Sequence, residues 1–118
     1  MTDSLQISVH NDKEGAVMYL QGRLNIESTP DLRDHLLAIL RRQSPLEAIV
    51  IDLARVSYMD TSGIATLIEG LKIARINGIA MHLQGLQGCL LHLFEATGIG
   101  SLFDTGGPMT NLSATAVS

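Results

Sequence analysis

The sequence is poor in cysteine, in basic residues and in aromatic residues, and each shortage excludes a class of protein. A single cysteine, Cys89, excludes a disulfide within the chain. Eight lysines and arginines against twelve acidic residues give a net charge of −4, whereas a nucleic-acid-binding protein needs a basic face and usually aromatic platforms. The chain has two tyrosines, two phenylalanines and no tryptophan. We therefore expect no nucleic-acid partner.

Long apolar runs and targeting signals are also missing. No run approaches the roughly 20 apolar residues that span a bilayer, and the segment Met1–Gln6 lacks the basic and apolar regions of a signal peptide. These absences predict a cytoplasmic protein with no direct membrane insertion. The chain has 118 residues, of which 46% are hydrophobic, so its size fits one domain with an aliphatic core.

Four stretches show the patterns of β-strands. Leu5–His10 alternates apolar and polar residues, as a half-buried strand does. A second strand is predicted over Ala16–Leu20, and Gly22 is expected to end it. The nearly continuous apolar run Ala48–Leu53 predicts a central strand that is buried on both faces. Ile79–Leu83 is the fourth, and the short polar link after the first strand favours antiparallel pairing of the first two.

Three amphipathic helices are predicted between and after these strands. The first begins at Ser28, whose hydroxyl is expected to cap it. The second follows Gly63 and is expected to stop at Asn77–Gly78, because glycine tolerates the left-handed conformation that ends many helices. The third covers residues 88–97 and is expected to pack Cys89 as a small apolar residue.

The order of these elements, β-β-α-β-α-β-α, is typical of an α/β domain with a mixed sheet of four to five strands and helices packed on it. One domain is predicted over residues 1–105. The stretch 106–118 contains glycine, proline, serine and threonine but no charged residue. Because it has too little apolar surface to offset its ordering entropy, we expect a flexible tail.

Three segments of the chain resemble the STAS domain family, which includes sulfate transporters and anti-sigma factor antagonists. The first is Leu20–Asn25 with the helix that follows, the second joins Val50–Leu53 to Ser57–Ile64, and the third is Thr97–Phe103. They occur in the family's order and extend over about residues 5–104. The resemblance implies a single STAS-type α/β domain.

The segment Asp60-Thr61-Ser62-Gly63 resembles the Asp-Ser-Ser-Gly phosphorylation motif of the antagonists, with Ser62 at the phosphorylated position. The resemblance implies that an anti-sigma factor with serine kinase activity binds this protein and phosphorylates Ser62, and that a phosphoserine phosphatase resets it. It places partner binding at Asn25, Asp60, Thr61, Ser62 and Gly63. ATP belongs to the kinase, so we expect no cofactor, no metal and no catalytic residue, and the protein is not expected to be an enzyme.

Two positions depart from the antagonist pattern. Asn25 stands where many antagonists carry aspartate near the phosphorylated serine, and Thr61 stands where serine is common. Thr61 also gives the segment a likeness to the STAS subunit of bacterial lipid-transport ABC systems, which binds the transporter ATPase. That subunit role is the alternative function.

Three other interpretations of these residues are open at the level of sequence. Ser62 precedes a helix and could simply cap it. Asp60 and the Asp104-Thr-Gly segment resemble the paired loops of a dimeric aspartic protease, but three helical patterns argue against that all-β fold. Cys89 and His92 are one helical turn apart, but the other histidines are scattered and offer no paired ligands for zinc.

The expected tail makes the first prediction. Deleting residues 107–118 should leave the melting temperature and partner binding nearly unchanged, because this segment has no charges and no periodic apolar pattern. Thermal denaturation of the truncated and full-length chains tests this. A drop of several degrees would mean that the segment packs against the domain and that the boundary at residue 105 is wrong.

Overall fold

The computed structural model describes residues 5–11, 15–41 and 47–99 of the chain. The expected boundary at residue 105 and the pair Leu102 and Phe103 lie outside this described part. Within it, no helix is both long enough and apolar enough to cross a membrane. The elements in chain order are β1 (Gln6–Asn11), β2 (Gly15–Leu24), α1 (Thr29–Leu40), β3 (Ala48–Met59), α2 (Thr61–Ile76), β4 (Ala80–Gln84) and α3 (Gly88–Thr97).

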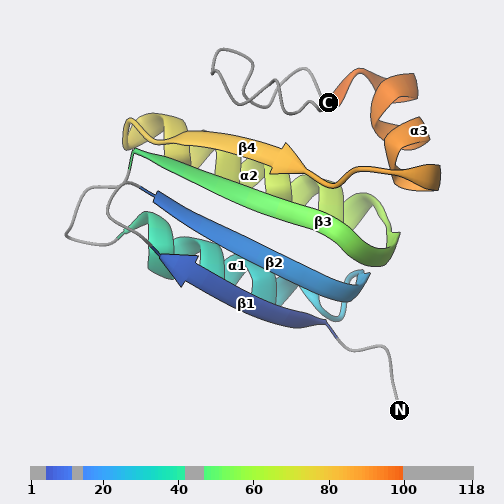
Figure 1. Cartoon of the computed structure of the whole chain (residues 1–118), viewed down its shortest axis with the longest axis horizontal. Helices are drawn as coiled ribbons and strands as arrows, with labels where there is room; N and C mark the ends of the chain where they lie inside the picture. Colours follow the sequence, from blue (N-terminus) through green and yellow to red (C-terminus); the bar gives the residue numbers. More distant parts are fainter. Residues whose placement is uncertain (1–4, 12–14, 42–46, 100–118) are drawn as a thin grey trace.

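The four strands form one sheet in the order β1-β2-β3-β4 (Figure 1). β1 pairs antiparallel with β2, with Val9 opposite Met18, whereas β2, β3 and β4 are parallel neighbours. The antiparallel first pair, the mixed sheet and the α/β class predicted from the sequence are therefore confirmed. The parallel strands bring the carboxyl ends of β2 and β3 to the same edge of the sheet.

Both α1 and α2 cover the same face of the sheet (Figure 1). Their buried side chains recur at helical spacing, as the sequence pattern predicted for α1. A Cβ at Gly70 of α2 would lie 3.1 Å from Leu36 Cδ1 and 3.5 Å from Met81 Cε. Glycine therefore lets α2 approach both α1 and β4 closely. The buried aliphatic residues of the two helices are Leu32, Leu36, Ile39, Leu40, Leu67, Leu71 and Ala74.

The third helix, α3, lies beyond the carboxyl end of β4 (Figure 1). It buries Leu90 and Phe94, while Leu93 is half-buried. The prediction that Cys89 packs inside is wrong, because its side chain is exposed. Successive residues of a helix are about 100° apart, so the turn that directs Leu90 inward directs Cys89 away from the core.

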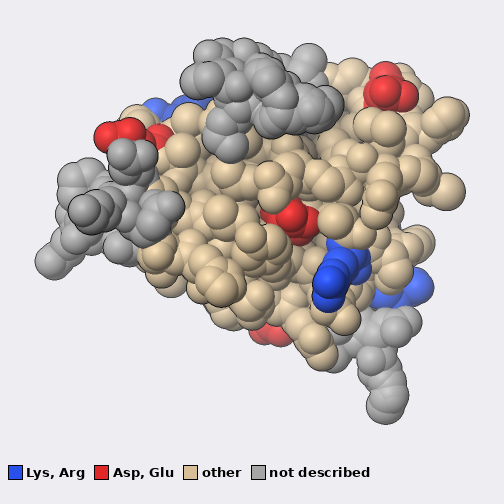
Figure 2. All heavy atoms as spheres, viewed as in Figure 1, with Lys and Arg blue, Asp and Glu red and all other residues tan. Residues whose placement is uncertain are grey.

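The strand β3 is central in the sheet, as predicted, but only its helix-covered face is buried throughout; on the other face Val50 is buried, whereas Ala48 and Asp52 are half-buried. Ile49 and Ile51 are fully buried on the helix-covered side, and Val50 between them is 7% exposed on the other side. On that outer face, Asp52 Oδ2 accepts a hydrogen bond of 2.7 Å from Gln84 Nε2. Figure 2 shows this side of the molecule, where most of the visible described surface is uncharged and a few acidic and basic side chains lie within it.

Both β2 and β3 extend further than the sequence predicted, which corrects two boundaries. β2 continues through Gly22 to Leu24, and β3 continues past Leu53 to Met59. Two register shifts occur in the pairing of these strands, and Gly22 has a φ of 113°. The shifts space the later buried residues of β3 by three, at Val56 and Met59, so the alternation that reveals a strand is lost there.

Helix α2 ends as predicted. Asn77 is its C-cap, and Gly78 follows with a φ of 72°. This left-handed conformation carries little cost for glycine. The turn also lets the N–H of Ile79 donate to the carbonyl of Ala74 at 2.8 Å, which starts the chain toward β4.

Burial of Ile51 makes the second prediction. It is 0% exposed and pairs in register with Met18 and Leu83 on the neighbouring strands. Ile51→Ala should lower the free energy of unfolding by about 2–5 kcal/mol, because it leaves a cavity between well-packed neighbours. Denaturant titration measures this, with Ile76→Ala as control because Ile76 is 82% exposed. A loss under about 1 kcal/mol for Ile51→Ala would contradict the position of β3.

Candidate functional site

The residues singled out by the sequence meet at the carboxyl edge of the parallel strands. Asn25 directly follows β2, and Asp60 directly follows β3. The N–H of Asp60 donates to the carbonyl of Leu24 at 3.2 Å, so one backbone hydrogen bond joins the two chain exits. The predicted site residues Thr61, Ser62 and Gly63 then form the first turn of α2.

Asp60, not Ser62, caps α2. Asp60 has an extended backbone, and its Oδ1 accepts from the N–H of Ser62 at 2.9 Å and from that of Gly63 at 3.3 Å. Both amides belong to the first turn, where N–H groups lack the usual partner four residues earlier; that of Gly63 also donates to the backbone carbonyl of Asp60 at 3.1 Å. The interpretation of Ser62 as a cap is therefore wrong, because α2 already begins at Thr61 and the side chain that caps it is that of Asp60.

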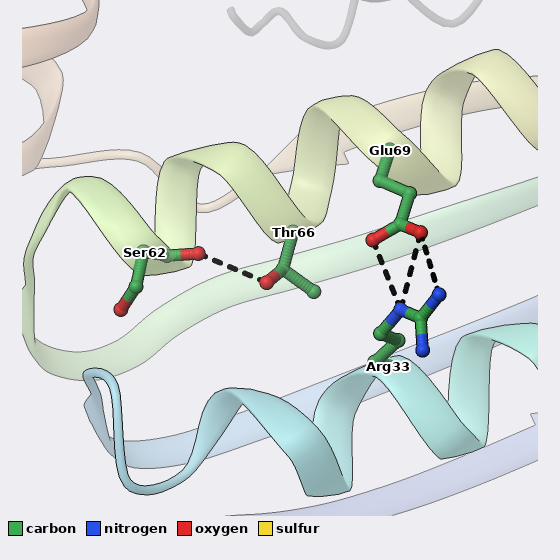
Figure 3. Close-up of polar contacts among 4 residues, drawn as sticks. All are labelled: Arg33, Ser62, Thr66 and Glu69. Carbon is green, nitrogen blue, oxygen red and sulfur yellow. Dashed lines mark hydrogen bonds and ion pairs between the residues drawn. The ribbon is translucent and has the colours of Figure 1, made fainter.

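The Ser62 hydroxyl is oriented by the same carboxylate. Ser62 Oγ donates to Asp60 Oδ1 at 2.5 Å, and the residue is half-buried. In Figure 3 its side chain extends at the start of α2, away from the helix body, while its carbonyl accepts a 2.9 Å hydrogen bond from Thr66 Oγ1. The hydroxyl oxygen thus lies at the N-terminal end of α2, where the helix dipole favours a negative charge.

The hydrogen bonds to Asp60 lower the pKa of its carboxyl below the usual value of 3.8. The largest cause is the hydroxyl of Ser62. Desolvation, the next in size, opposes it, and the backbone N–H groups of Gly63, Ser62 and Ile26 lower the pKa further. Each donor stabilises the charged form. Asp60 therefore stays ionised at neutral pH beside the Ser62 hydroxyl.

Gly63 is needed for the close approach of α2 to the strands. A Cβ at this position would lie 2.8 Å from Met59 Cγ, 3.0 Å from Leu24 Cγ and 3.1 Å from the carbonyl oxygen of Leu24. The contacts with Leu24 include backbone, which cannot move aside easily. Gly63 therefore contributes to the site through packing, because it lets the start of α2 lie close to the ends of β2 and β3.

Asn25 holds a tight turn. Its Oδ1 accepts from the N–H of Glu27 at 2.9 Å and from that of Ser28 at 3.1 Å. Its backbone carbonyl accepts from the N–H groups of Ser28 and Thr29 at 3.0 and 2.9 Å. An aspartate could accept the same bonds, so asparagine at this position preserves the turn while leaving out a negative charge.

Ser28 completes this turn instead of capping α1 with its hydroxyl, which corrects the expected cap. Ser28 occupies the N-cap position, but its side chain makes no capping hydrogen bond. Ser28 Oγ donates to the carbonyl of Arg23 at 2.8 Å and accepts from the N–H of Asn25 at 3.0 Å. The hydroxyl cannot cap the helix because it faces back toward the end of β2.

The structure brings the five predicted site residues together at one corner, with Thr61 exposed beside the half-buried Ser62. Sequence reasoning missed Ser28 and Ile26, which belong to the same corner. An asparagine with serine three residues later is typical of a turn closed by side-chain hydrogen bonds, and that spacing could have identified Ser28.

A salt bridge joins α1 to α2 further along the same pair of helices. Arg33 binds both carboxylate oxygens of Glu69, at 3.1 Å from Nε and 2.9 Å from Nη2 (Figure 3). Both side chains are about half exposed, at 52% and 41%, so solvent screens the pair. It lies outside the corner that holds Ser62.

Comparison with known sequences identifies a matching family and several named relatives. The sequence family described as "Mlab, STAS domain" matches residues 7–104. The chain is 25% identical over 101 residues to the anti-sigma-B factor antagonist of Bacillus subtilis (strain 168), which covers 86% of this chain and 90% of the relative. It is 31% identical over 81 residues to the protein of that name in Staphylococcus aureus (strain NCTC 8325 / PS 47), covering 69% and 73%.

Solved structures show the same fold. An anti-sigma factor antagonist from Mycobacterium paratuberculosis gives a TM-score of 0.74 at 21% identity, covering 99% of this chain and 97% of that one. The anti-sigma factor antagonist SpoIIAA in its unphosphorylated form gives 0.69 at 16% identity, covering 96% and 98%. The Bacillus cell fate determinant SpoIIAA in its phosphorylated form gives 0.64 at 16% identity, covering 93% and 99%.

The cap at Asp60 makes the third prediction. Because its pKa is lower in the folded chain than in the unfolded chain, the carboxylate stabilises the fold above the unfolded pKa, and this stabilisation is lost as the pH falls through the folded value. Asp60→Asn can still cap the helix but does not titrate. The melting temperature of the wild type should therefore exceed that of Asp60→Asn at neutral pH, and the gap should shrink below about pH 4.

Thermal melts of both proteins between pH 2 and pH 7 measure this gap. Asp34→Asn serves as control, because Asp34 is an exposed acid of α1 and its removal reports the effect of losing one surface charge. A gap that stays constant across the range would show that the charge of Asp60 does not stabilise the helix start.

Proposed function

The chain belongs to the STAS domain family, and we propose that it acts as an anti-sigma factor antagonist. In its unmodified form it binds an anti-sigma factor that has serine kinase activity, which frees the sigma factor held by that partner. Phosphorylation of Ser62 releases the antagonist, and a phosphoserine phosphatase restores it. The protein itself supplies no catalytic residue, works in the cytoplasm and needs no cofactor.

One observation carries this proposal: the hydroxyl of Ser62 is presented at the start of α2, oriented by Asp60. Two relatives with sequence similarity over most of the chain are named anti-sigma-B factor antagonists. A structural neighbour, SpoIIAA, has been solved in unphosphorylated and phosphorylated forms. These names support a role in binding an anti-sigma factor, and the geometry of Ser62 supports modification at this position.

The physical effect of the phosphate falls on the surface of the domain. It adds about −1.5 to −2 charges at pH 7 next to the carboxylate of Asp60, which already accepts the amides of the first turn. The phosphate must therefore project outward. A partner that docks on this corner would bury the charge at a cost of several kcal/mol. Since each 1.4 kcal/mol is tenfold in affinity, binding should weaken by about a hundredfold or more.

A second candidate function is the STAS subunit of a lipid-transport ABC system, docked on the transporter ATPase. Thr61 favours it, because the Asp-Thr-small-Gly segment of that subunit is similar to residues 60–63. The matching family description names Mlab instead of an antagonist. This role requires no phosphoserine, so it predicts a stable complex with an unmodified chain.

Substitution of Ser62 makes the fourth prediction. With candidate anti-sigma factor kinase and ATP, the wild type should gain one phosphate, whereas Ser62→Ala should gain none and bind constitutively. Ser62→Asp should bind about a hundredfold more weakly without unfolding. Because Asp60 is the cap, Ser62→Ala removes only one hydrogen bond and should melt close to the wild type. Mass spectrometry, calorimetric titration and thermal melts supply the three measurements.

Thr61→Ala is the matched control, because Thr61 carries the neighbouring hydroxyl and is exposed. It should gain one phosphate like the wild type, because the modified hydroxyl is that of Ser62 and not that of Thr61. The switch is not at Ser62 if Ser62→Ala is modified as readily as the wild type, or if Ser62→Asp binds as tightly. A stable complex of unmodified chain with a transporter ATPase, and none with a kinase, would favour the second candidate.

A further inference from the structure

Ile26 is a large apolar side chain that projects into solvent beside the proposed switch. It is 73% exposed, although it lies only two residues after Leu24, the fully buried last residue of β2. Ile76 is comparably exposed, at 82%, but it is the last residue of α2, at the opposite end of that helix from Ser62. Of these two isoleucines, only Ile26 lies at the corner that holds Ser62.

The backbone around Ile26 is fixed before any partner binds. Asn25 Oδ1 accepts from the N–H groups of Glu27 and Ser28, and the hydroxyl of Ser28 bonds to the backbone of Arg23 and of Asn25. Hydrogen bonds thus close the turn on both sides of Ile26. A partner would therefore pay little ordering entropy to bind this side chain.

The turn that carries Ile26 is also linked to Ser62. The N–H of Asp60 bonds to the carbonyl of Leu24 at 3.2 Å, and the N–H of Ile26 is among the groups that lower the pKa of Asp60. Asp60 therefore accepts from the Ser62 hydroxyl through its carboxylate and bonds through its N–H to the strand end that leads into this turn. A phosphate on Ser62 would lie next to Asp60, the residue that joins the start of α2 to the strand end before this turn.

Arg23 lies near the end of β2, just before the same turn, and its side chain is held by a cation–π contact. The guanidinium of Arg23 lies 4.2 Å from the centroid of the Tyr58 ring, and the two residues are register partners on β2 and β3. Tyr58 is 41% exposed and Arg23 is half-buried. Within the described part of the chain, no carboxylate pairs with Arg23. Stacking limits the side chain's motion while its charge remains available.

We propose that Ile26 and Arg23 are the two anchors of the partner interface around Ser62. The partner that fits them presents an apolar socket for Ile26 and a carboxylate for Arg23. Buried apolar contacts form the centre of protein interfaces, and arginine is enriched among the residues that dominate their affinity. An acidic group drawn to Arg23 is repelled by a phosphate on Ser62, so one partner chemistry accounts for both binding and release.

This inference rests on the proposed function, and its test uses the kinase that phosphorylates the wild type. Calorimetric titration compares the unmodified wild type with Ile26→Ser and Arg23→Gln. Each substitution should weaken binding by about tenfold or more. The effect of Arg23→Gln should shrink as salt rises, because it removes a charge contact, whereas that of Ile26→Ser should not.

The matched controls are Ile76→Ser and Arg55→Gln. Ile76 is an exposed residue at the end of α2, and Arg55 is an exposed residue of β3. Both should bind within about twofold of the wild type, and circular dichroism should show that all four variants are folded. If the wild type binds but Ile26→Ser and Arg23→Gln bind equally well, this inference is overturned and the proposed function stands. If the wild type neither binds nor is phosphorylated by the kinase, both are overturned.

Discussion

The carboxylate of Asp60 is the interaction on which the rest of the site depends. It accepts from amides of the first turn of α2 and from the hydroxyl of Ser62, while the N–H of Asp60 bonds to the end of β2. One residue therefore holds the start of α2, the hydroxyl of Ser62 and the end of β2. The same hydrogen bonds lower the pKa of the Asp60 carboxyl, since every donor favours its ionised form.

The parallel pairing of β2 and β3 brings that residue to its place. Because both strands run in the same direction, their carboxyl ends lie at one edge of the sheet, and the turn at Asn25 comes next to the start of α2. Gly63 then lets the helix approach Leu24 and Met59 more closely than any side chain would permit. The rigid corner results from these two constraints, one of topology and one of volume.

In the proposed switch, modification acts by adding charge at the surface and leaves the core unchanged. The buried cluster of the sheet and of α1 and α2 lies behind the corner, and Ser62 is separated from it by Gly63 and the strand ends. The relatives named as antagonists and the solved forms of SpoIIAA are consistent with such a binding role. The exposed turn at Ile26 and the stacked Arg23 give that surface a distinct chemistry.

The sequence by itself determined the α/β class, the buried face of α1, the end of α2 at Gly78 and the segment that holds Ser62, because helical period and glycine conformation are local properties. It did not determine the cap of α2 or the ends of β2 and β3. Capping depends on which side-chain oxygen accepts from the amides of the first turn, and in α2 that oxygen belongs to Asp60. Register shifts abolish the alternation that marks a strand. Only the tertiary structure places the end of β2, which leads into the turn at Ile26, next to the start of α2, because that proximity arises from pairing between distant parts of the chain.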